Sequence, residues 1–313
     1  MSYTLKVVKS IDELVGHTPM VRLNRLPDPN GASIYAKLEY FNPTKSVKDR
    51  AARHMILAAE QEGKLKKGAT IIEPTSGNMG IGLAMNAVAR GYKAMIVMPD
   101  TMTRERKNLL KAFGAKVVLT PGRDKMPGAI RKAEELNRTI PDSFMPMQFS
   151  NPANPQAHLL STAPEIIEDM NTLGKPLRAF VGAAGTGGTI TGTGKALKKA
   201  FPELTIHICE PSGSPVLSGG KPGRHKIVGT SPGFIPETLD LSLVDEIIKV
   251  SDHDAYEITR RLATEEGILC GPSSGASVFV ALQVARRFTP GDVIVCMIND
   301  TGERYLSGDI FPR

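Results

Sequence analysis

From residue 69 onward, short runs rich in apolar and β-branched residues alternate with stretches of helical periodicity. This alternation is typical of βαβ units, which form a parallel sheet with helices on both faces. Runs such as Lys116-Val117-Val118-Leu119 are nearly continuous in apolar residues, as expected of strands covered on both faces. The expected strands are Ala69–Glu73, Lys93–Met98, Lys116–Leu119, Leu177–Ala183, Thr205–Cys209, Glu246–Val250 and Val293–Ile298. The expected helices are Gly80–Arg90, Thr103–Phe113, Gly128–Leu136, Ile190–Ala200, Ala255–Glu266 and Ala276–Arg287.

The alternation is interrupted at Phe149–Pro155, a segment that contains two prolines, and then starts again. A chain of 313 residues is also long enough for two domains. The sequence therefore predicts an α/β protein with two doubly wound, mainly parallel sheets. A loop rich in Gly, Pro and Ser spans residues 211–236, and its length is consistent with either a functional segment or a tolerated surface insertion.

Composition excludes several classes of protein. The net charge is +7, but the basic residues are scattered, so the clustered stripe of a nucleic-acid-binding protein is missing. No apolar run reaches the length of a membrane span, and the first residues lack a signal-peptide core, so we expect a cytoplasmic protein. The three cysteines are far apart, which argues against a disulfide framework or a zinc site, and we expect no metal. Cys209 and Cys296 lie in expected strands and are interpreted as buried free thiols.

A lysine lies at the start of an expected helix, in Asn42-Pro43-Thr44-Lys45-Ser46-Val47-Lys48-Asp49-Arg50. Ser46 and Asp49 form a capping pattern, which places Lys48 in the first turn. The positive end of the helix and the neighbouring charge of Lys45 would both lower the pKa of Lys48 and favour its free amine. From this segment alone, a solvated surface lysine is the simpler interpretation.

Three further polar loops each lie where a helix is expected to begin. Gly185-Thr186-Gly187-Gly188-Thr189 follows a strand and would present backbone N–H groups and hydroxyls to a phosphate, although it matches neither a P-loop nor a dinucleotide fingerprint. Pro74-Thr75-Ser76-Gly77-Asn78 offers neutral donors suited to a carboxylate. In Gly271-Pro272-Ser273-Ser274-Gly275, a serine hydroxyl can meet a heteroaromatic nitrogen. The alternative for the first loop is a turn that binds no ligand. For the second loop the alternative is helix capping by Ser76 or Asn78, and for the third it is helix capping by one of its serines.

A lysine at a helix start combined with a phosphate loop is what an enzyme needs to hold pyridoxal 5'-phosphate covalently. The six histidines show no metal-ligand spacing, and no Ser/His/Asp order indicates a hydrolase.

Taken together, these motifs resemble those of the cysteine synthase (O-acetylserine sulfhydrylase) family. This family belongs to the tryptophan synthase β-like, fold type II pyridoxal phosphate enzymes. The resemblance covers nearly the whole chain. It rests on the motifs Gly16-His17-Thr18-Pro19-Met20, Ser46–Arg50, Pro74–Asn78, Gln148-Phe149 with Asn151–Asn154, Gly185–Thr189 and Gly271–Gly275.

The resemblance implies a role for each matching residue. Lys48 binds the cofactor aldehyde and later moves the substrate α-proton. Ser273 meets the pyridine nitrogen, and because a neutral serine leaves this nitrogen largely unprotonated, β-elimination is favoured over transamination. The implied cofactor-binding residues are Lys48, Asn78, Gly185, Thr186, Gly187, Gly188, Thr189 and Ser273. The implied substrate-binding residues are Thr75, Ser76, Asn78, Met79 and Gln148.

The resemblance also implies two domains with the cofactor in the cleft between them. The smaller would span residues 42–151, and the larger, which binds the cofactor phosphate, residues 1–41 and 152–313. The implied reaction is β-replacement, in which O-acetylserine or O-phosphoserine reacts with sulfide to give L-cysteine. The alternatives are a β-lyase such as a cysteine desulfhydrase, a synthase for cystathionine or another β-substituted alanine, and a non-catalytic homologue that binds a partner peptide. A homodimer and binding of serine acetyltransferase are implied in the same way.

The chain departs from the family pattern at Lys45 and Ala163, where glycine is usual, and at Met79, where threonine is usual. Ser231-Pro232 also departs from a more glycine-rich loop. These departures bear on the substrate. A cation at Lys45, with Arg224 or Lys226, would favour a phosphorylated leaving group, whereas a solvent-facing Lys45 would not.

Overall fold

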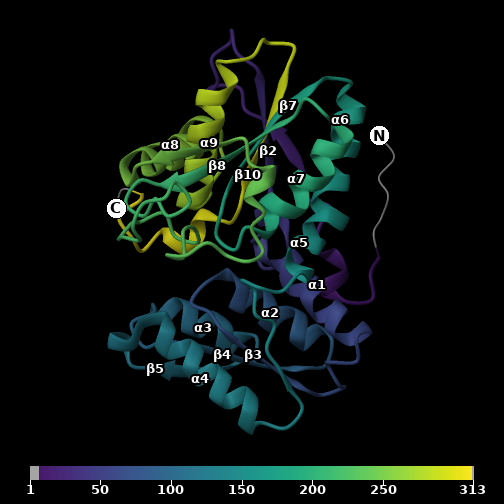
Figure 1. Cartoon of the computed structure of the whole chain (residues 1–313), viewed down its shortest axis with the longest axis vertical. Coiled ribbons are helices and arrows are strands. Elements are labelled where there is room, and N and C mark those ends of the chain that lie inside the picture. Colours follow the sequence, from purple (N-terminus) through teal and green to yellow (C-terminus); the bar gives the residue numbers. More distant parts are fainter. Residues whose placement is uncertain (1–6, 312–313) are drawn as a thin grey trace. The chain divides into compact units, whose positions relative to one another are not determined.

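The computed structural model describes residues 7–311, which divide into two compact units. The smaller unit comprises residues 7–16, Asn42–Thr44 and Lys48–Met147. The larger comprises His17–Phe41, Lys45–Val47 and residues 148–311. In this division residues 7–16 group with the smaller unit and residues 148–151 with the larger. Each unit is an α/β structure built around its own sheet (Figure 1).

The smaller unit contains a four-stranded, wholly parallel sheet in the order β5-β4-β3-β6. Alternate residues of its strands point to opposite faces, as the pleat requires. Ile72, Met95 and Val97 pack with helix α4 on one face, whereas Ile96 lies against Gly80 of helix α2 on the other. The elements are η1 (Ile11–Leu14), α1 (Lys48–Gln61), β3 (Thr70–Pro74), α2 (Asn78–Ala89), β4 (Lys93–Pro99), α3 (Arg104–Ala112), β5 (Lys116–Thr120), η3 (Gly122–Asp124), α4 (Lys125–Thr139) and β6 (Ser143–Phe144).

The larger unit contains a six-stranded sheet in the order β1-β2-β10-β7-β8-β9. Only the β1–β2 pair is antiparallel. Helices α8 and α9 cover one face and α6 and α7 the other, again through alternate strand residues. The elements are β1 (Met20–Arg22), β2 (Ser33–Leu38), η2 (Glu39–Phe41), α5 (Ala153–Ala157), a π-helical turn (His158–Thr162), α6 (Ala163–Leu173), β7 (Leu177–Ala183), α7 (Gly188–Ala200), β8 (Thr205–Pro211), η5 (Leu241–Leu243), β9 (Glu246–Val250), α8 (Asp252–Glu265), α9 (Pro272–Ala285), β10 (Val293–Ile298) and η6 (Gly302–Tyr305).

The two mainly parallel sheets confirm the predicted fold class, and every predicted strand and helix is present. Five helices, α2, α4, α7, α8 and α9, begin two to four residues earlier than the sequence predicts, and two of them bear on the candidate ligand loops. Helix α7 begins at Gly188 rather than near Ile190, and α9 begins at Pro272 rather than at Ala276. Gly188, Thr189 and Ser273 are therefore first-turn residues of helices and not loop residues.

Several features bear on the excluded classes. Among residues 7–311, no helix combines the length and the apolar character needed to cross a membrane. The same residues contain no group of three or more His, Cys, Asp or Glu side chains that could hold a metal ion. The three cysteines are free and buried, which confirms the interpretation of Cys209 and Cys296 as buried thiols.

Candidate active site

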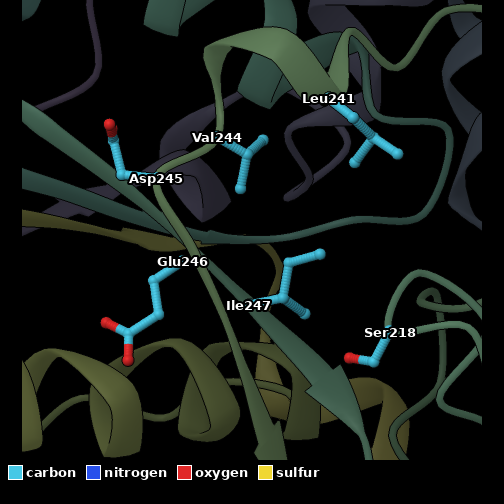
Figure 2. Close-up of a pocket in the computed structure, with 6 residues that line it drawn as sticks. All are labelled: Ser218, Leu241, Val244, Asp245, Glu246 and Ile247. Atoms are coloured by element: carbon cyan, nitrogen blue, oxygen red, sulfur yellow. The ribbon is translucent and has the colours of Figure 1, made fainter.

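A surface pocket of about 330 Å³ lies beside β9, an edge strand of the larger unit, and its lining contains none of the residues predicted to bind a ligand (Figure 2). Two carboxylates, Asp245 and Glu246, lie along it. Asp245 accepts hydrogen bonds from Lys198 and from the backbone of Ile206, and Glu246 pairs with Arg287. Because this lining is acidic and already bonded, it does not suit a phosphate. The glycine-rich helix starts are the better candidates.

The start of α7 is shaped by glycines that a side chain could not replace. Gly187, the N-cap residue, has φ +84°, a conformation that L side chains rarely adopt. A Cβ on it would lie 2.4 Å from the Cβ of Leu239, and a Cβ on Gly188 would lie 2.1 Å from Oδ1 of Asn154. Gly187 also provides no side-chain oxygen for the first N–H groups of the helix. An anion placed at this turn would supply the missing acceptor.

The hydroxyl of Thr186, in this turn, is already an acceptor. Its Oγ1 accepts from Nδ2 of Asn154 at 2.9 Å and from the backbone N–H of Gly188 at 3.4 Å. A hydroxyl has one proton, and an oxygen held as an acceptor on one side directs that proton elsewhere. Thr186 is only 3% exposed, so the proton is available to a ligand rather than to bulk water. Asn154 also donates to the carbonyl of Gln148 at 2.8 Å, which links this predicted substrate-binding residue to the turn that contains Thr186.

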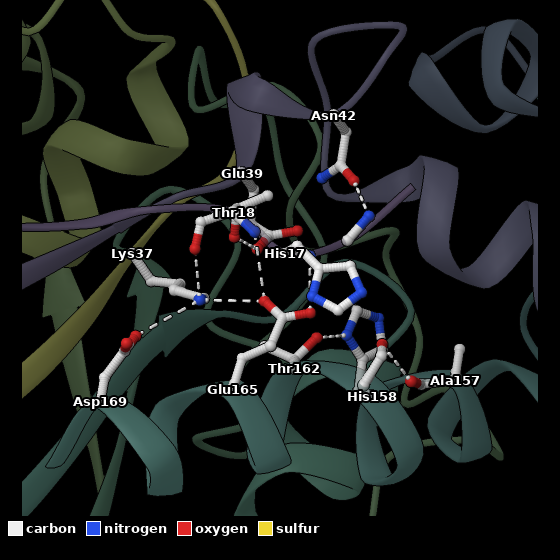
Figure 3. A network of polar contacts seen from close by, with 12 residues as sticks. His17, Thr18, Lys37, Glu39, Asn42, Ala157, His158, Thr162, Glu165 and Asp169 are labelled. Carbon is white, nitrogen blue, oxygen red and sulfur yellow. Dashed lines mark hydrogen bonds and ion pairs between the residues drawn. The ribbon is translucent and has the colours of Figure 1, made fainter. Parts of the chain in front are cut away.

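Thr189 is supported by a histidine that the sequence did not single out. Nε2 of buried His158 lies 3.3 Å from Oγ1 of Thr189. Its Nδ1 lies 2.9 Å from Oγ1 of Thr162 (Figure 3). With the proton on Nε2, the imidazole donates to Thr189 and leaves the Thr189 proton for a ligand. His158 opens the π-helical turn His158–Thr162, a local geometry that often occurs at functional sites.

The same region is anchored by a buried lysine. Lys37 of β2 is 1% exposed, and its ammonium donates to the carbonyl of Thr18 at 2.6 Å and pairs with Glu165 at 2.9 Å (Figure 3). Asp169 lies 3.7 Å from the same ammonium, and burial raises the pKa of its carboxyl. Glu165 also accepts the backbone N–H of His17 at 2.8 Å. The Gly16–Met20 motif therefore serves to pack the N-terminal part of the larger unit onto α6.

Ser273 lies in the first turn of α9 and is 6% exposed. Its Oγ accepts from Nδ2 of Asn299 at 3.2 Å, so its proton is directed away from Asn299. The N-cap is Gly271, which forms no side-chain cap. The interpretation of these serines as N-caps is therefore wrong, and Ser273 has the donor geometry that a heteroaromatic nitrogen requires. Cys270, just before the cap, is buried, and burial raises the pKa of its thiol.

The Thr75–Asn78 loop of the smaller unit lies between β3 and α2. The N-cap of α2 is Gly77, which makes no side-chain cap, so the alternative in which Ser76 or Asn78 caps the helix is wrong. Oγ1 of Thr75 instead accepts the N–H of Gly77 at 3.2 Å. Nη1 of Arg106, which the sequence did not single out, donates to the carbonyl of Ser76 at 2.6 Å and holds the loop. The helix start remains suited to a carboxylate.

Lys48 is the first residue of α1. The carboxylate of Asp49 accepts the backbone N–H of Thr44 at 2.7 Å and also the Thr44 hydroxyl. The structure thus bonds the carboxylate of Asp49 to Thr44, five residues back along the chain. The Lys45 ammonium lies on the surface and pairs with Glu303 at 2.5 Å, which offsets the charge that was expected to act on Lys48.

The other departures from the family pattern have definite surroundings. Met79, in the first turn of α2, is 2% exposed. Ala163 begins α6 with a helical φ of −67° and is fully buried, so alanine fits this position without backbone strain. Ser231 has φ +41°, and its hydroxyl donates to the carbonyl of Ser214 at 2.7 Å. The backbone N–H of Ser231 also bonds the carbonyl of Ala184, so the 211–236 loop is tied to the segment just before Gly185.

These residues fit pyridoxal phosphate. The N-cap residue of α7 provides no side-chain acceptor, and the hydroxyl of Thr186 is held as a donor, as a phosphate requires. The hydroxyl of Thr189 is a second donor when the proton of His158 is on Nε2. Ser273 is a third hydroxyl held as a donor, as an unprotonated ring nitrogen requires. The structure supplies a separate neutral helix start, at Gly77, for a carboxylate.

Comparison with known proteins agrees with this assignment. The family model described as pyridoxal-phosphate dependent enzyme matches residues 11–300. The chain is 66% identical to a probable cysteine synthase of Bacillus subtilis strain 168, over 98% of this chain and 99% of the relative. Among solved structures it is similar to an O-ureido-L-serine synthase (TM-score 0.94, 45% identity, 98% and 96% covered). It is also similar to a cysteine synthase from Entamoeba histolytica (TM-score 0.93, 40% identity, 99% and 93% covered).

Proposed function

Because the chain belongs to the family of pyridoxal-phosphate-dependent enzymes, we propose that it catalyses β-replacement and makes L-cysteine from O-acetylserine and sulfide. The observation that carries the proposal is that asparagine amides hold the hydroxyls of Thr186 and Ser273 in a donor orientation. The hydroxyl of Thr189 joins them when the proton of His158 is on Nε2. The 66% identity to a probable cysteine synthase supports the choice of reaction.

The proposed cofactor-binding residues divide by chemistry. The turn Gly185–Thr189 holds the phosphate through backbone N–H groups, the hydroxyls of Thr186 and Thr189, and the dipole of α7. Ser273 donates to the pyridine nitrogen, and Asn78 bonds the phenolic oxygen. When bound, the cofactor withdraws electrons from the substrate Cα and so acidifies the α-proton.

Lys48 is the proposed catalytic residue. It holds the cofactor and then, as a free amine, accepts the α-proton and returns it to the product. The hydroxyls of Thr75 and Ser76, together with the side chain of Gln148, bind the substrate carboxylate without placing a cation beside it. Met79 completes this substrate-binding set from the first turn of α2.

The choice between acetate and phosphate as the leaving group depends on whether nearby cations are already ion-paired. Lys45 is paired with Glu303, and Lys226 is paired with Asp309 at 2.5 Å; all four side chains are at least half exposed. Neither lysine is left with an uncompensated charge that would favour a phosphate. With both lysines paired, the case for O-phosphoserine would rest on Arg224 alone, so O-acetylserine is the proposed substrate.

The test is product profiling of the purified protein with sulfide and, in turn, O-acetylserine, O-phosphoserine and serine. We expect cysteine from O-acetylserine at the highest kcat/KM and none from the Lys48→Ala variant, which also loses covalently bound cofactor. Absence of cysteine from every activated serine would refute the proposed reaction. A Lys45→Gly variant that changes the preference between the acetylated and phosphorylated substrates would refute the argument from paired cations.

The second candidate is a synthase for another β-substituted alanine. The similarity to an O-ureido-L-serine synthase supports it, because the same residues would catalyse elimination and only the nucleophile would differ. Competition between sulfide and other nucleophiles in a single reaction, followed by mass spectrometry, separates the two. A cysteine desulfhydrase would instead consume cysteine and release sulfide.

The assembly and location are further parts of the proposal, supported by the family resemblance. We propose a cytoplasmic homodimer whose substrate loop also accepts the C-terminal peptide of serine acetyltransferase. Light scattering tests the dimer, and displacement of substrate by such a peptide tests the partner. A colourless protein that cannot be reconstituted with cofactor would favour the non-catalytic alternative.

A further inference from the structure

Asn299, the first residue after β10, connects three segments of the larger unit. Its carbonyl accepts the backbone N–H of Val47 at 2.8 Å, and its own N–H donates to Oγ of Ser274 at 2.9 Å. Its side-chain Nδ2 donates to Oγ of Ser273 at 3.2 Å. One residue thus contacts both the segment that leads into Lys48 and the start of α9.

The backbone around Asn299 is fixed independently of its side chain. Ser46 and Asp300 form a β-bridge, and the N–H of Thr301 bonds the carbonyl of Lys45 at 3.3 Å. Together with the Val47 contact, these bonds pair residues 45–47 with residues 299–301. The side chain of Asn299 is therefore presented to Ser273 from a held backbone, and replacing it leaves the pairing in place.

The direction of the hydrogen bond between Asn299 and Ser273 has a chemical consequence. A serine hydroxyl can donate one proton and accept at its lone pairs. While it accepts from the amide of Asn299, its proton points toward whatever group lies on its other side. A hydroxyl that can only donate in that direction matches a ring nitrogen with a lone pair and opposes a protonated one.

We propose that Asn299 is a positioning residue that holds the Ser273 hydroxyl as a donor and thereby keeps the cofactor ring nitrogen unprotonated. The inference rests on the proposed function, which places this nitrogen at Ser273. An aspartate at position 299 would reverse the bond, because a carboxylate only accepts. Ser273 would then donate to the carboxylate and offer a lone pair to the ring, which favours a protonated nitrogen.

The experiment is NMR of cofactor labelled with ¹⁵N in the ring, bound to the intact protein, because the ¹⁵N chemical shift reports directly on protonation. We expect an unprotonated shift in the wild type and a shift toward the protonated form in Asn299→Asp near neutral pH. The matched control is Asn171→Asp, which makes the same charge change at an exposed position on α6. The control should retain the wild-type shift.

A second variant tests the proposal if Asn299→Asp folds poorly or binds little cofactor. Asn299→Ala frees the Ser273 hydroxyl to rotate, so cofactor affinity should fall by about 5-fold, the effect of one lost hydrogen bond, without protonation of the ring. Thermal melting of the cofactor-free variants separates this change from a loss of fold.

The outcomes are distinct. A loaded Asn299→Asp protein with the wild-type ¹⁵N shift, or wild-type affinity in Asn299→Ala, would overturn the role of Asn299 alone. A wild-type protein that binds no cofactor would overturn the proposed function and this inference with it. A protonated nitrogen in the wild type would overturn the inference but leave the cofactor assignment intact.

Discussion

Two groups of helix starts in this chain differ in how the first N–H groups find acceptors. Helices α3 and α8 are capped by their own side chains, since Thr103 accepts from the N–H of Arg106 and Ser251 accepts from that of Asp254. Helices α2, α7 and α9 have glycine N-caps, at Gly77, Gly187 and Gly271, and none of these forms a side-chain cap. The self-capped starts contribute to stability alone. The glycine starts, which coincide with the predicted ligand loops, leave donors for a ligand.

The largest expected effect comes from obstructing a glycine start. Gly187→Ala forces a side chain onto a residue at φ +84° and against Leu239, including its Cα at 2.8 Å. Cofactor affinity, measured by titration of the cofactor-free protein, should fall at least about 100-fold. The control is Gly91→Ala, which has φ +79° but no atom within 4 Å and so shows the backbone strain alone. Equal cofactor affinities in the two variants would contradict phosphate binding at the turn Gly185–Thr189.

A smaller effect is expected from converting a glycine start into a self-capped one. Gly77 has an extended backbone with φ −118°, and a Cβ there would meet nothing within 4 Å. Gly77→Asp should stabilise α2 by only about 0.3 kcal/mol, because glycine is itself a tolerated N-cap, while its carboxylate competes with that of the substrate. We expect KM for O-acetylserine to rise by about 10-fold or more, equivalent to ~1.4 kcal/mol. Gly77→Ala adds the Cβ without the charge and should keep KM; an unchanged KM in Gly77→Asp would disprove ligand binding at this start.

Removing a self-cap should affect stability without affecting the ligand. In Ser251→Ala the N–H of Asp254 loses its acceptor, at 3.1 Å in the native protein. The free energy of unfolding, measured in urea, should fall by about 1 kcal/mol. Cofactor affinity and KM should not change, and a parallel loss of cofactor would remove the distinction between the two kinds of start.

The smallest effect concerns Cys270, next to the glycine start of α9. A helix start lowers a thiol pKa where the thiol is accessible, but burial raises the pKa of Cys270, so the native thiol stays protonated. Because the folded pKa is raised, its contribution to stability is complete below the unfolded pKa of about 8.5 and is lost as pH rises above it. Wild type should lose about 0.4 kcal/mol more than Cys270→Ala between pH 7 and 8.5. Alkylation of Cys270 in the native protein at pH 8 would contradict the assignment.

The sequence predicts the elements of this fold well where the pattern is local. The strands Leu177–Ala183, Glu246–Val250 and Val293–Ile298 have the predicted bounds, because each is a short run rich in apolar and β-branched residues between polar turns. The alternation did not single out β2 (Ser33–Leu38), although it pairs with β10 in the middle of the larger sheet. It contains Lys37, a charge that interrupts the apolar run and is buried only because Glu165 compensates it from far along the chain.

In the candidate site too, local motifs could be predicted from the sequence and contacts between distant residues could not. The glycine and hydroxyl residues of the loops could be predicted because each loop is a short contiguous motif. Their supports could not, since Asn154, His158 and Asn299 lie 26 to 32 residues away from the hydroxyls they contact. The helix starts were misplaced for a related reason: Ser76 and Ser273 are favourable capping residues by type, but the backbone places glycine at the N-cap.

The glycine starts have a consequence for the amount of protein that a cell maintains. A ligand that accepts hydrogen bonds from the N–H groups at these helix starts stabilises the folded chain. The gain grows with the logarithm of the ligand concentration divided by its dissociation constant. With the cofactor at 100 times its dissociation constant, this gain is about 2.7 kcal/mol. Under vitamin limitation the cofactor-free chains would unfold more often and be degraded first, so nutritional supply would set the abundance of the enzyme as well as its activity.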